Sequence, residues 1–515
     1  MDFSALPYAA RIAVGLAGIS ILYLLFNEFT VGRRRRSLQR EKGTLPAPYY
    51  TGFRDRFLGL DLFVANMKHL KERRFLENAV LRFHHDKVNT MRVVSLGEQM
   101  HFTMEPENLK TIQAIDFKRW KLSSRRKFGF RPLLGEGIFT TDGPAWHHSR
   151  DMLRPNFVRS QIGDLATFEK HIAHLIEAVP RDSSTVDLAE LFFRLTMDSA
   201  TEFLFGESTE SLSKGGNEGF AEAFTRSQEY IAHKSRWGLM TVLFPANKNW
   251  DQDRTFVHSF VDHYVDKGLA KRDVLLAQKS NAQRYIFIDE LIRQTTDRVR
   301  IRSELLNVLL AGRDTTASLL TNVWFTLSQR PDLWTKLQAE IGGLNGEIPT
   351  FEQLKELKFL KALLNESLRL YPVVPVNSRQ AQVDTTLPLG GGPDGSAPIF
   401  IKKGTGVAWS VYGMHRRKDY YGEDAEEFRP ERWLDDPLTG KKGLRPGWEY
   451  LPFNGGARIC LGQQFALTEA SYTTARLCQA FDRIESRDSQ PWTESLTLTC
   501  VNLGGAKVRL TARDT

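Results

Sequence analysis

Apolar residues recur at helical spacing along most of the chain. Amphipathic or apolar helical patterns are strongest over 168–178, 187–205, 302–329, 332–340 and 359–370. Short alternating or apolar runs predict strands over 91–96, 398–401, 406–410 and 496–501. No repeat with a period of 20–50 residues stands out, and no long low-complexity tract marks a boundary. The pattern therefore predicts a single large, mainly α-helical domain with small β-sheets.

The first part of the chain has a different pattern. Residues 6–26 carry one charged side chain, Arg11, and residues 12–26 are uncharged and largely apolar. A helix over 6–26 extends about 31 Å, enough to cross a bilayer core of ~30 Å. The run Arg33-Arg34-Arg35-Arg36 follows, and the positive-inside rule places the rest of the chain in the cytosol. A cleaved signal peptide is the alternative, but no basic cluster precedes the apolar run and no A-x-A site follows it.

The chain is thus predicted to have three parts. Residues 1–32 form an N-terminal transmembrane signal anchor, and residues 33–50 form a basic stop-transfer segment and a Pro-containing linker. Residues 51–515 form the globular domain.

Composition narrows the class of protein further. Hydrophobic residues make up 41% and charged residues 25% of the 515 residues, which excludes a disordered or fibrous chain. Three cysteines, Cys460, Cys478 and Cys500, are too few for a disulfide scaffold or a structural zinc cage. The formal charge of +9 falls to +5 without the four-arginine run, so much of the basicity reflects membrane topology. No nucleic-acid-binding motif is present, and no nucleic-acid partner is expected.

The most specific segment surrounds Cys460. Gly455, Gly456 and Gly462 allow tight turns and a close approach of the backbone to another group. Cys460 directly precedes a strong helix-forming run, whose N-terminal dipole favours the thiolate, and Arg458 supplies a cation nearby. A thiolate in such a loop suits a soft or borderline metal ion. A buried structural cysteine is the ordinary alternative for a lone cysteine.

This segment resembles the cytochrome P450 superfamily of haem-thiolate monooxygenases. The family pattern F-x-x-G-x-R-x-C-x-G is met at Phe453, Gly456, Arg458, Cys460 and Gly462. The resemblance implies heme b (iron protoporphyrin IX), with Cys460 as the axial ligand of the iron and with Phe453 and Arg458 in the cofactor site. It also implies O2 and NADPH-derived electrons as co-substrates, and it covers residues 44 to the C-terminus, so 51–515 is expected to be a cytochrome P450 catalytic domain.

Other segments supply further expected site residues. Trp146 and Arg150 lie four residues apart, share a helical face and can both donate hydrogen bonds to a haem propionate. The resemblance adds Arg379 as another propionate donor. Asp314 and Thr315 interrupt an apolar helix with polar side chains, which is typical of functional sites. By resemblance, Thr315 holds dioxygen and its water, and Asp314 relays protons.

One predicted constellation is structural. Glu366 and Arg369 form an E-x-x-R pair at i, i+3, and alone such a pair is usually a surface ion pair. Downstream, Arg432 belongs to a P-E-R-W segment that matches the family. The resemblance implies that these three side chains form a buried network that positions the cysteine loop.

The substrate class is predicted from two segments, 311–317 and 460–470, which are similar to the alkane- and fatty-acid-hydroxylating branch of yeasts and moulds. Ala457 departs from that branch, where we expect proline. The predicted reaction is hydroxylation of a long-chain alkane or fatty acid, at its terminal carbon. A tailoring oxidase of a fungal secondary-metabolite pathway, acting on a terpenoid or polyketide, is the alternative. A tailoring oxidase would share all of these motifs with an aliphatic hydroxylase. The two enzymes would differ in the residues that line the substrate pocket, in segments 116–137, 206–244 and 502–504.

The chain carries no flavin or nicotinamide fingerprint. Its electrons are therefore expected from a separate NADPH–cytochrome reductase, whose acidic face could dock on a basic surface. The expected location is the endoplasmic reticulum membrane, as a single-pass protein with a cytosolic catalytic domain.

Overall fold

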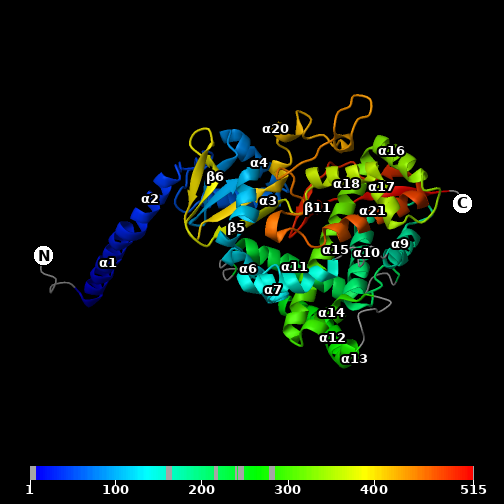
Figure 1. Ribbon diagram of the computed structural model, residues 1–515, viewed down its shortest axis with the longest axis horizontal. Helices are drawn as coiled ribbons and strands as arrows, with labels where there is room; N and C mark the ends of the chain where they lie inside the picture. The colour runs from blue at the N-terminus through cyan, green and yellow to red at the C-terminus, as the bar shows by residue number, and fades with distance from the viewer. Residues whose placement is uncertain are drawn as a thin grey trace.

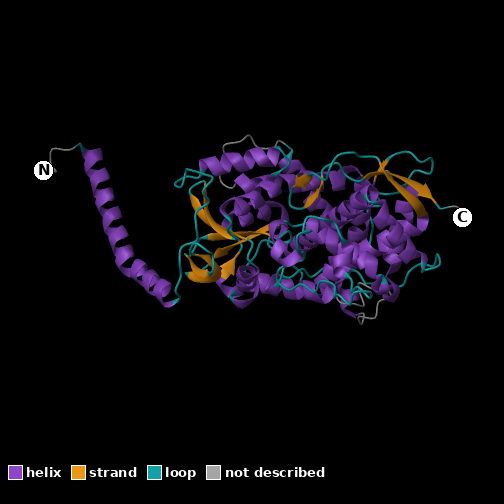
Figure 2. Ribbon diagram, turned by 90° about the horizontal axis from the view of Figure 1, so that it is seen from above, coloured by secondary structure: helices purple, strands orange, loops and turns teal. Residues whose placement is uncertain are grey.

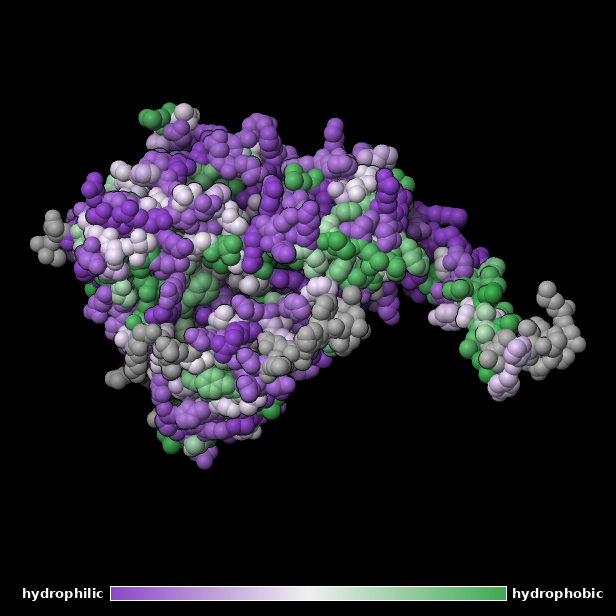
Figure 3. Space-filling model, turned by 180° about the vertical axis from the view of Figure 1, so that it is seen from behind, coloured by the Kyte–Doolittle hydropathy of each residue, from purple (hydrophilic) through white to green (hydrophobic). Residues whose placement is uncertain are grey.

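The computed structural model describes residues 7–157, 165–213, 218–237, 241, 249–277 and 285–513. Helix α1 (Tyr8–Asn27) continues through a π-helical turn (Glu28–Gly32) into α2 (Arg33–Glu41), and together they project from the body (Figure 1). The stretch Ile12–Glu41 has the length and composition of a membrane span, and none of its apolar window is buried. Figure 3 shows hydrophobic residues along this projecting helix and on the adjacent part of the body.

The segment after α2 is packed against the domain. Leu45 N–H donates to the carbonyl of Pro398 over 2.9 Å, and Ala47 is 1% exposed. Arg35 makes a bidentate ion pair with Asp384, at 2.9 and 3.1 Å. The linker that we assign to residues 33–50 is therefore attached at both ends, because its extended backbone finds hydrogen-bond partners on the domain.

Most strands lie beside the anchor or near the C-terminus, and a short pair lies between them (Figure 2). The larger sheet has the order β1-β2-β8-β5-β3, in which β2 and β8 are parallel and the other neighbours antiparallel. The strand bounds are β1 (Thr90–Ser95), β2 (Glu98–Thr103), β3 (Trp120–Lys121), β4 (Val186–Asp187), β5 (Val376–Ala381), β6 (Thr385–Gly391), β7 (Ala397–Ile401), β8 (Gly406–Ser410), β9 (Phe481–Ser486), β10 (Glu494–Leu496), β11 (Cys500–Asn502) and β12 (Lys507–Ala512).

Helices make up most of the body. They are α3 (Leu60–Lys71), α4 (Phe75–Asp86), α5 (Pro106–Lys110), α6 (Ser124–Leu134), α7 (Gly143–Leu153), α9 (Leu165–Ala178), α10 (Leu188–Phe205), α11 (Glu218–Trp237), α12 (Trp250–Leu269), α13 (Arg272–Ala277), α14 (Phe287–Gln294), α15 (Arg298–Gln329), α16 (Pro331–Gly342), α17 (Phe351–Glu356), α18 (Lys358–Leu370), α19 (Val411–Met414), α20 (Lys418–Tyr421) and α21 (Gln463–Ala480).

Helix α15 is the centre of the packing. Its residues 301–310 belong to one large hydrophobic cluster, and its residues 317–327 belong to another. The polar residues Asp314 and Thr315 lie between these two stretches, where the helix passes from one cluster to the other. The polar interruption therefore falls between two cores rather than within one.

The mainly helical fold with small sheets is confirmed, and all five predicted helices are present. The predicted strand 406–410 coincides with β8, but the predicted strand 496–501 is wrong. That segment spans the β10–β11 hairpin, in which Thr497 N–H donates to the carbonyl of Thr499. A short apolar run and a tight hairpin of two very short strands have the same pattern, so the sequence did not separate them.

Candidate active site

The loop around Cys460 is folded back on itself. The Cys460 N–H donates to the carbonyl of Phe453 over 2.9 Å, which closes the loop. Gly456 has φ of +59°, and a Cβ at this position would lie 2.0 Å from the carbonyl oxygen of Gln113, so only glycine fits. Helix α21 begins three residues after Cys460 and directs its N-terminal amides towards this loop.

The Cys460 thiol is surrounded by protein, yet its surface is accessible to a molecule the size of water. Burial raises the pKa of Cys460, while the backbone N–H of Gly462 and the guanidinium of Arg150 lower it in part. Both observations fit an atom on the wall of an internal hollow. We expected Arg458 to be the cation that acts on the thiol. The structure shows Arg150 in this role, because Arg458 is paired with Asp142.

A cluster of buried cations lies beside this loop. Burial lowers the pKa of Arg126 and of Arg458 to about 10, and burial together with these two neighbours lowers the pKa of Arg379 well below its usual value. The facing carboxylate is Asp142, which is 2.7 Å from Arg458 Nη2 and 2.7 Å from Lys127 Nζ. This single carboxylate does not balance the charges of the three arginines and Lys127, and burying a charge without a counter-ion is costly. The cluster is therefore suited to a further anionic group.

The predicted propionate residues are brought together here. Trp146 is 2% exposed, and its ring centre lies 4.5 Å from the guanidinium carbon of Arg458 and 5.6 Å from that of Arg150. Arg150 donates to the carbonyl of Ile459, and Arg379 donates to Asn377 Oδ1 over 3.0 Å. A side chain that can become a thiolate, beside cations that lack sufficient anions, is the donor set that a haem requires. The residues present therefore fit this cofactor.

Helix α15 presents one accessible stripe to the interior. Val308, Ala311, Gly312 and Thr315 are partly accessible, whereas almost every other residue from 303 to 328 is buried. These positions share one helical face, so the stripe borders a hollow within the body. Thr315 Oγ1 donates to the carbonyl of Ala311 over 2.7 Å, which places its hydroxyl on this face.

Asp314 lies behind this stripe. It is 6% exposed and forms an ion pair with Arg313 at 3.1 Å. Burial raises the pKa of Asp314, and Arg313 and the side chain of Gln228 on α11 offset part of the rise. A buried carboxyl that keeps its proton more readily than usual is suited to proton transfer.

The predicted structural network is present and fully buried. Arg369 makes a bidentate pair with Glu366, at 2.8 and 2.9 Å, and Arg432 Nε donates to the same carboxylate over 2.8 Å. Trp433 Nε1 and the N–H of Arg429 also donate to Glu366. All of the carboxylate's partners are donors, so its buried charge is well compensated.

His415 connects this network to the cysteine loop and was missed by the sequence reasoning. The N–H of Leu451 donates to His415 Nε2 over 2.9 Å, so Nδ1 carries the proton and donates to the carbonyl of Arg369. Burial lowers the pKa of His415 to about 3, which keeps the ring neutral. A single histidine within a basic stretch gives no sequence signal for this role.

Arg126 and Glu469 were also missed. Arg126 lies in a run of basic residues that is typical of a solvated helix face. Glu469 is 1% exposed on α21 and accepts a hydrogen bond from Ser199 on α10. Burial raises the pKa of Glu469 to about 7, with hydroxyl groups offsetting part of the rise. Only tertiary packing shows that either side chain is buried.

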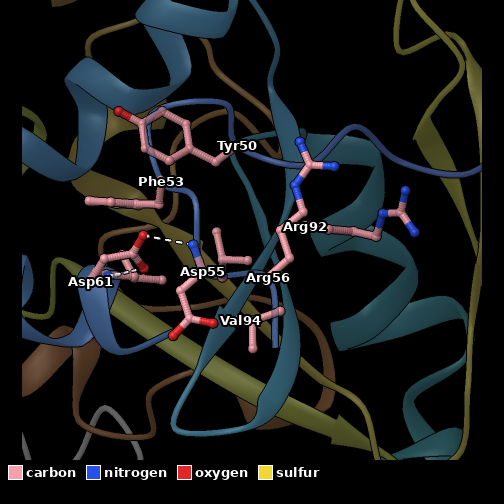
Figure 4. Close-up of a pocket in the computed structure, with 9 residues that line it drawn as sticks. Tyr50, Phe53, Asp55, Arg56, Asp61, Arg92 and Val94 are labelled. Carbon is pink, nitrogen blue, oxygen red and sulfur yellow. Dashed lines mark hydrogen bonds between the residues drawn. The ribbon is translucent and has the colours of Figure 1, made fainter. Parts of the chain in front are cut away.

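A separate small pocket lies at the start of the domain (Figure 4). Its Asp61 accepts the backbone N–H groups of Arg54 and Asp55. Asp55 accepts those of Leu58 and Leu60, and these hydrogen bonds lower its pKa to about 2. The two carboxylates therefore stabilise the turn that leads into α3, and they do not form a catalytic pair.

Known proteins resemble this chain over most of its length. The family model described as Cytochrome P450 matches residues 57–504. The chain is 41% identical over 507 residues to Cytochrome P450 monooxygenase FPY7 of Fusarium mangiferae, covering 97% of this chain and 96% of that protein. It is 42% identical over 507 residues to Cytochrome P450 monooxygenase himC of Aspergillus japonicus, covering 97% and 90%. It is 45% identical over 477 residues to Cytochrome P450 52A12 of Debaryomyces hansenii, covering 88% and 90%.

Proposed function

The chain belongs to the cytochrome P450 family of monooxygenases, and on that premise we propose that it is a membrane-anchored enzyme that hydroxylates a long-chain alkane or fatty acid at its terminal carbon. The observation that supports the proposal most directly is the enclosed but accessible thiol of Cys460 beside a cluster of under-compensated arginines.

Heme b bound in this hollow would supply the redox chemistry that inserts one atom of O2 into a C–H bond. Cys460 would hold the iron as a thiolate. Arg126, Arg379 and Arg458 would compensate the propionates, and Trp146 would pack beside them. The buried Glu366–Arg369–Arg432 network would hold the cysteine loop in place.

Thr315 and Asp314 would manage protons on the opposite side of the hollow. The Thr315 hydroxyl lies on the accessible face of α15, where it can orient a water molecule. Asp314, the residue before Thr315, is buried, which raises the pKa of its carboxyl, and the ion pair with Arg313 holds that carboxyl in place. This pair would deliver protons to the reacting oxygen while the apolar surroundings exclude bulk water.

Two features support an aliphatic substrate. The accessible stripe of α15 is small and apolar apart from Thr315, which suits a narrow hydrocarbon chain. The sequences of segments 311–317 and 460–470 resemble those of fungal alkane and fatty-acid hydroxylases. Of the expected pocket segments, 116–137 and 502–504 are described, whereas 214–217, 238–240 and 242–244 lie outside the described residues.

The partner and location follow from the same proposal. A separate NADPH–cytochrome reductase would supply electrons, and α1 would anchor the protein in the endoplasmic reticulum membrane with the catalytic domain in the cytosol. The basic helix α2 and the Arg35–Asp384 pair support this orientation, because they hold positive charge between the anchor and the body.

The test combines binding with product analysis. The full-length protein is titrated with saturated alkanes, fatty alcohols and fatty acids while the haem spin state is followed. Turnover with reductase and NADPH is then analysed for the position of hydroxylation. We expect a spin-state response and a terminal alcohol. A protein that responds to terpenoids or polyketides and to no aliphatic chain would be the tailoring oxidase instead.

A further inference from the structure

Two further cations, Arg236 and Arg73, lie outside the cluster beside Cys460. Arg236 lies in the last turn of α11, and Arg73 lies in the connector between α3 and α4. Burial lowers the pKa of Arg236, and the charge of Arg73 lowers it further, so the two guanidiniums repel each other across a partly desolvated space. Neither forms an ion pair with any residue in the part of the chain that the structure describes.

The hydrogen bonds of Arg236 show where it is held. Its Nη2 donates to the carbonyls of Leu496 and Thr497, at 2.6 and 3.0 Å, in the turn of the β10–β11 hairpin. Both of these acceptors are neutral carbonyls, so no carboxylate among the described residues pairs with Arg236. The following segment, 238–248, contains no Asp or Glu in its sequence.

Burial raises the pKa of Glu494 and the charge of Arg73 offsets part of this rise, but this carboxylate is already engaged by backbone donors. Both oxygens of Glu494 accept backbone N–H groups, from Phe75 at 2.6 Å and from Leu76 at 2.9 Å, at the start of α4. This contact holds the connector that carries Arg73 against β10. Glu494 therefore fixes the position of one cation without forming an ion pair with either.

The hairpin turn also packs against the hydrophobic interior. Leu498, the residue after Thr497, packs against the same hydrophobic cluster as Val308 of the α15 stripe. Cys500 N–H donates to the carbonyl of Val373, in the segment that leads into β5. One turn thus faces the cations on one side and the apolar interior on the other. Helices α3 and α11 contact each other through Phe63 and Trp237, the neighbour of Arg236, whose ring centres are 5.2 Å apart.

We propose that Arg236, assisted by Arg73, binds the carboxylate of a long-chain fatty acid whose hydrocarbon tail passes Leu498 towards the α15 stripe. This inference rests on the proposed function and narrows its substrate class to the acids. A guanidinium binds a carboxylate through paired N–H donors, and the nitrogens of Arg236 that do not contact the hairpin are available for it. Arg73 is more exposed, so its contribution is screened by solvent and salt.

The test compares ligands of one chain length. Palmitic acid, 1-hexadecanol and hexadecane are titrated against the full-length holoenzyme and its Arg236→Gln variant by the haem spin-state shift. Glutamine keeps a side-chain N–H donor but carries no charge. We expect the ratio of acid affinity to alcohol affinity to fall about tenfold or more in Arg236→Gln, and by about threefold in Arg73→Gln. In the parent enzyme, added salt should weaken acid binding and leave alcohol binding nearly constant.

The matched control is Arg226→Gln on the same helix. Arg226 is paired bidentately with Asp253, at 2.8 and 3.0 Å, so its removal should leave the acid-to-alcohol ratio unchanged. If Arg236→Gln weakens acid and alcohol equally, Arg236 only holds the hairpin and the inference is overturned. If no aliphatic ligand shifts the spin state of the parent enzyme, the proposed function itself fails.

Discussion

Removing the Glu366 carboxylate should destabilise the protein far more than removing a surface carboxylate with the same local geometry. Glu366 is fully buried and accepts hydrogen bonds from Arg369, Arg432, Trp433 and the backbone. Glu366→Ala strands two buried guanidiniums, and breaking a buried pair costs about 3–5 kcal/mol. Since the free energy of unfolding of a domain is about 5–15 kcal/mol, we expect a large loss of holoprotein.

The chain contains a matched control. Glu77 and Arg74 are also spaced i, i+3 and also pair bidentately, at 2.9 and 3.1 Å, but their side chains are 49% and 61% exposed. Solvent screening reduces such a pair to about 0.2–1 kcal/mol, so Glu77→Ala should change the unfolding midpoint little. The two pairs differ in burial and in the additional donors, Arg432, Trp433 and the N–H of Arg429, that only Glu366 has.

Guanidinium chloride unfolding of the full-length holoprotein measures the difference. Tryptophan fluorescence reports the fold, and the thiolate-type band of the ferrous carbon monoxide complex reports the cysteine loop. Burial acts to raise the pKa of Glu366, but the hydrogen bonds and charges of Arg369 and Arg432 outweigh it and lower the pKa. This stabilisation is therefore present above the ordinary carboxyl pKa and is lost as the pH falls through the folded-state value. Equal shifts for Glu366→Ala and Glu77→Ala would refute the reasoning.

Three further substitutions test the active site. Cys460→Ser should abolish the thiolate-type carbon monoxide band, whereas Cys478→Ala, in the buried core, should lower stability but keep the band. Thr315→Ala should release more hydrogen peroxide per NADPH consumed, whereas Thr326→Ala, which removes the same kind of i−4 hydrogen bond elsewhere on α15, should leave coupling unchanged. Glu469 has a folded-state pKa of about 7, so stability should fall as the pH rises from about 4.3 to about 7, and Glu469→Gln should remove this dependence in denaturation curves.

Two kinds of information in this chain were readable without a structure. The helical periodicity located α9, α10, α15, α16 and α18, because the pattern of buried positions within one helix is local. The cysteine loop was readable for a related reason: Gly456, with its positive φ, and the fixed spacing of the motif residues to Cys460 satisfy constraints that act within ten residues. The hairpin at 494–502 could not be predicted from the sequence, because it depends on contacts with Arg236 and Val373, which are distant in the chain.

The sequence by itself therefore determined the family, the glycine-rich loop around Cys460 and the helix that carries Asp314 and Thr315. The tertiary structure decided which charges are compensated. Arg126 and Arg236 look like ordinary surface cations in the sequence, and Glu469 looks like an ordinary helix residue. Whether a charged side chain is solvated, paired or left without a counter-ion depends on elements that are distant in the chain, and that partnership sets its pKa and its capacity to bind a ligand.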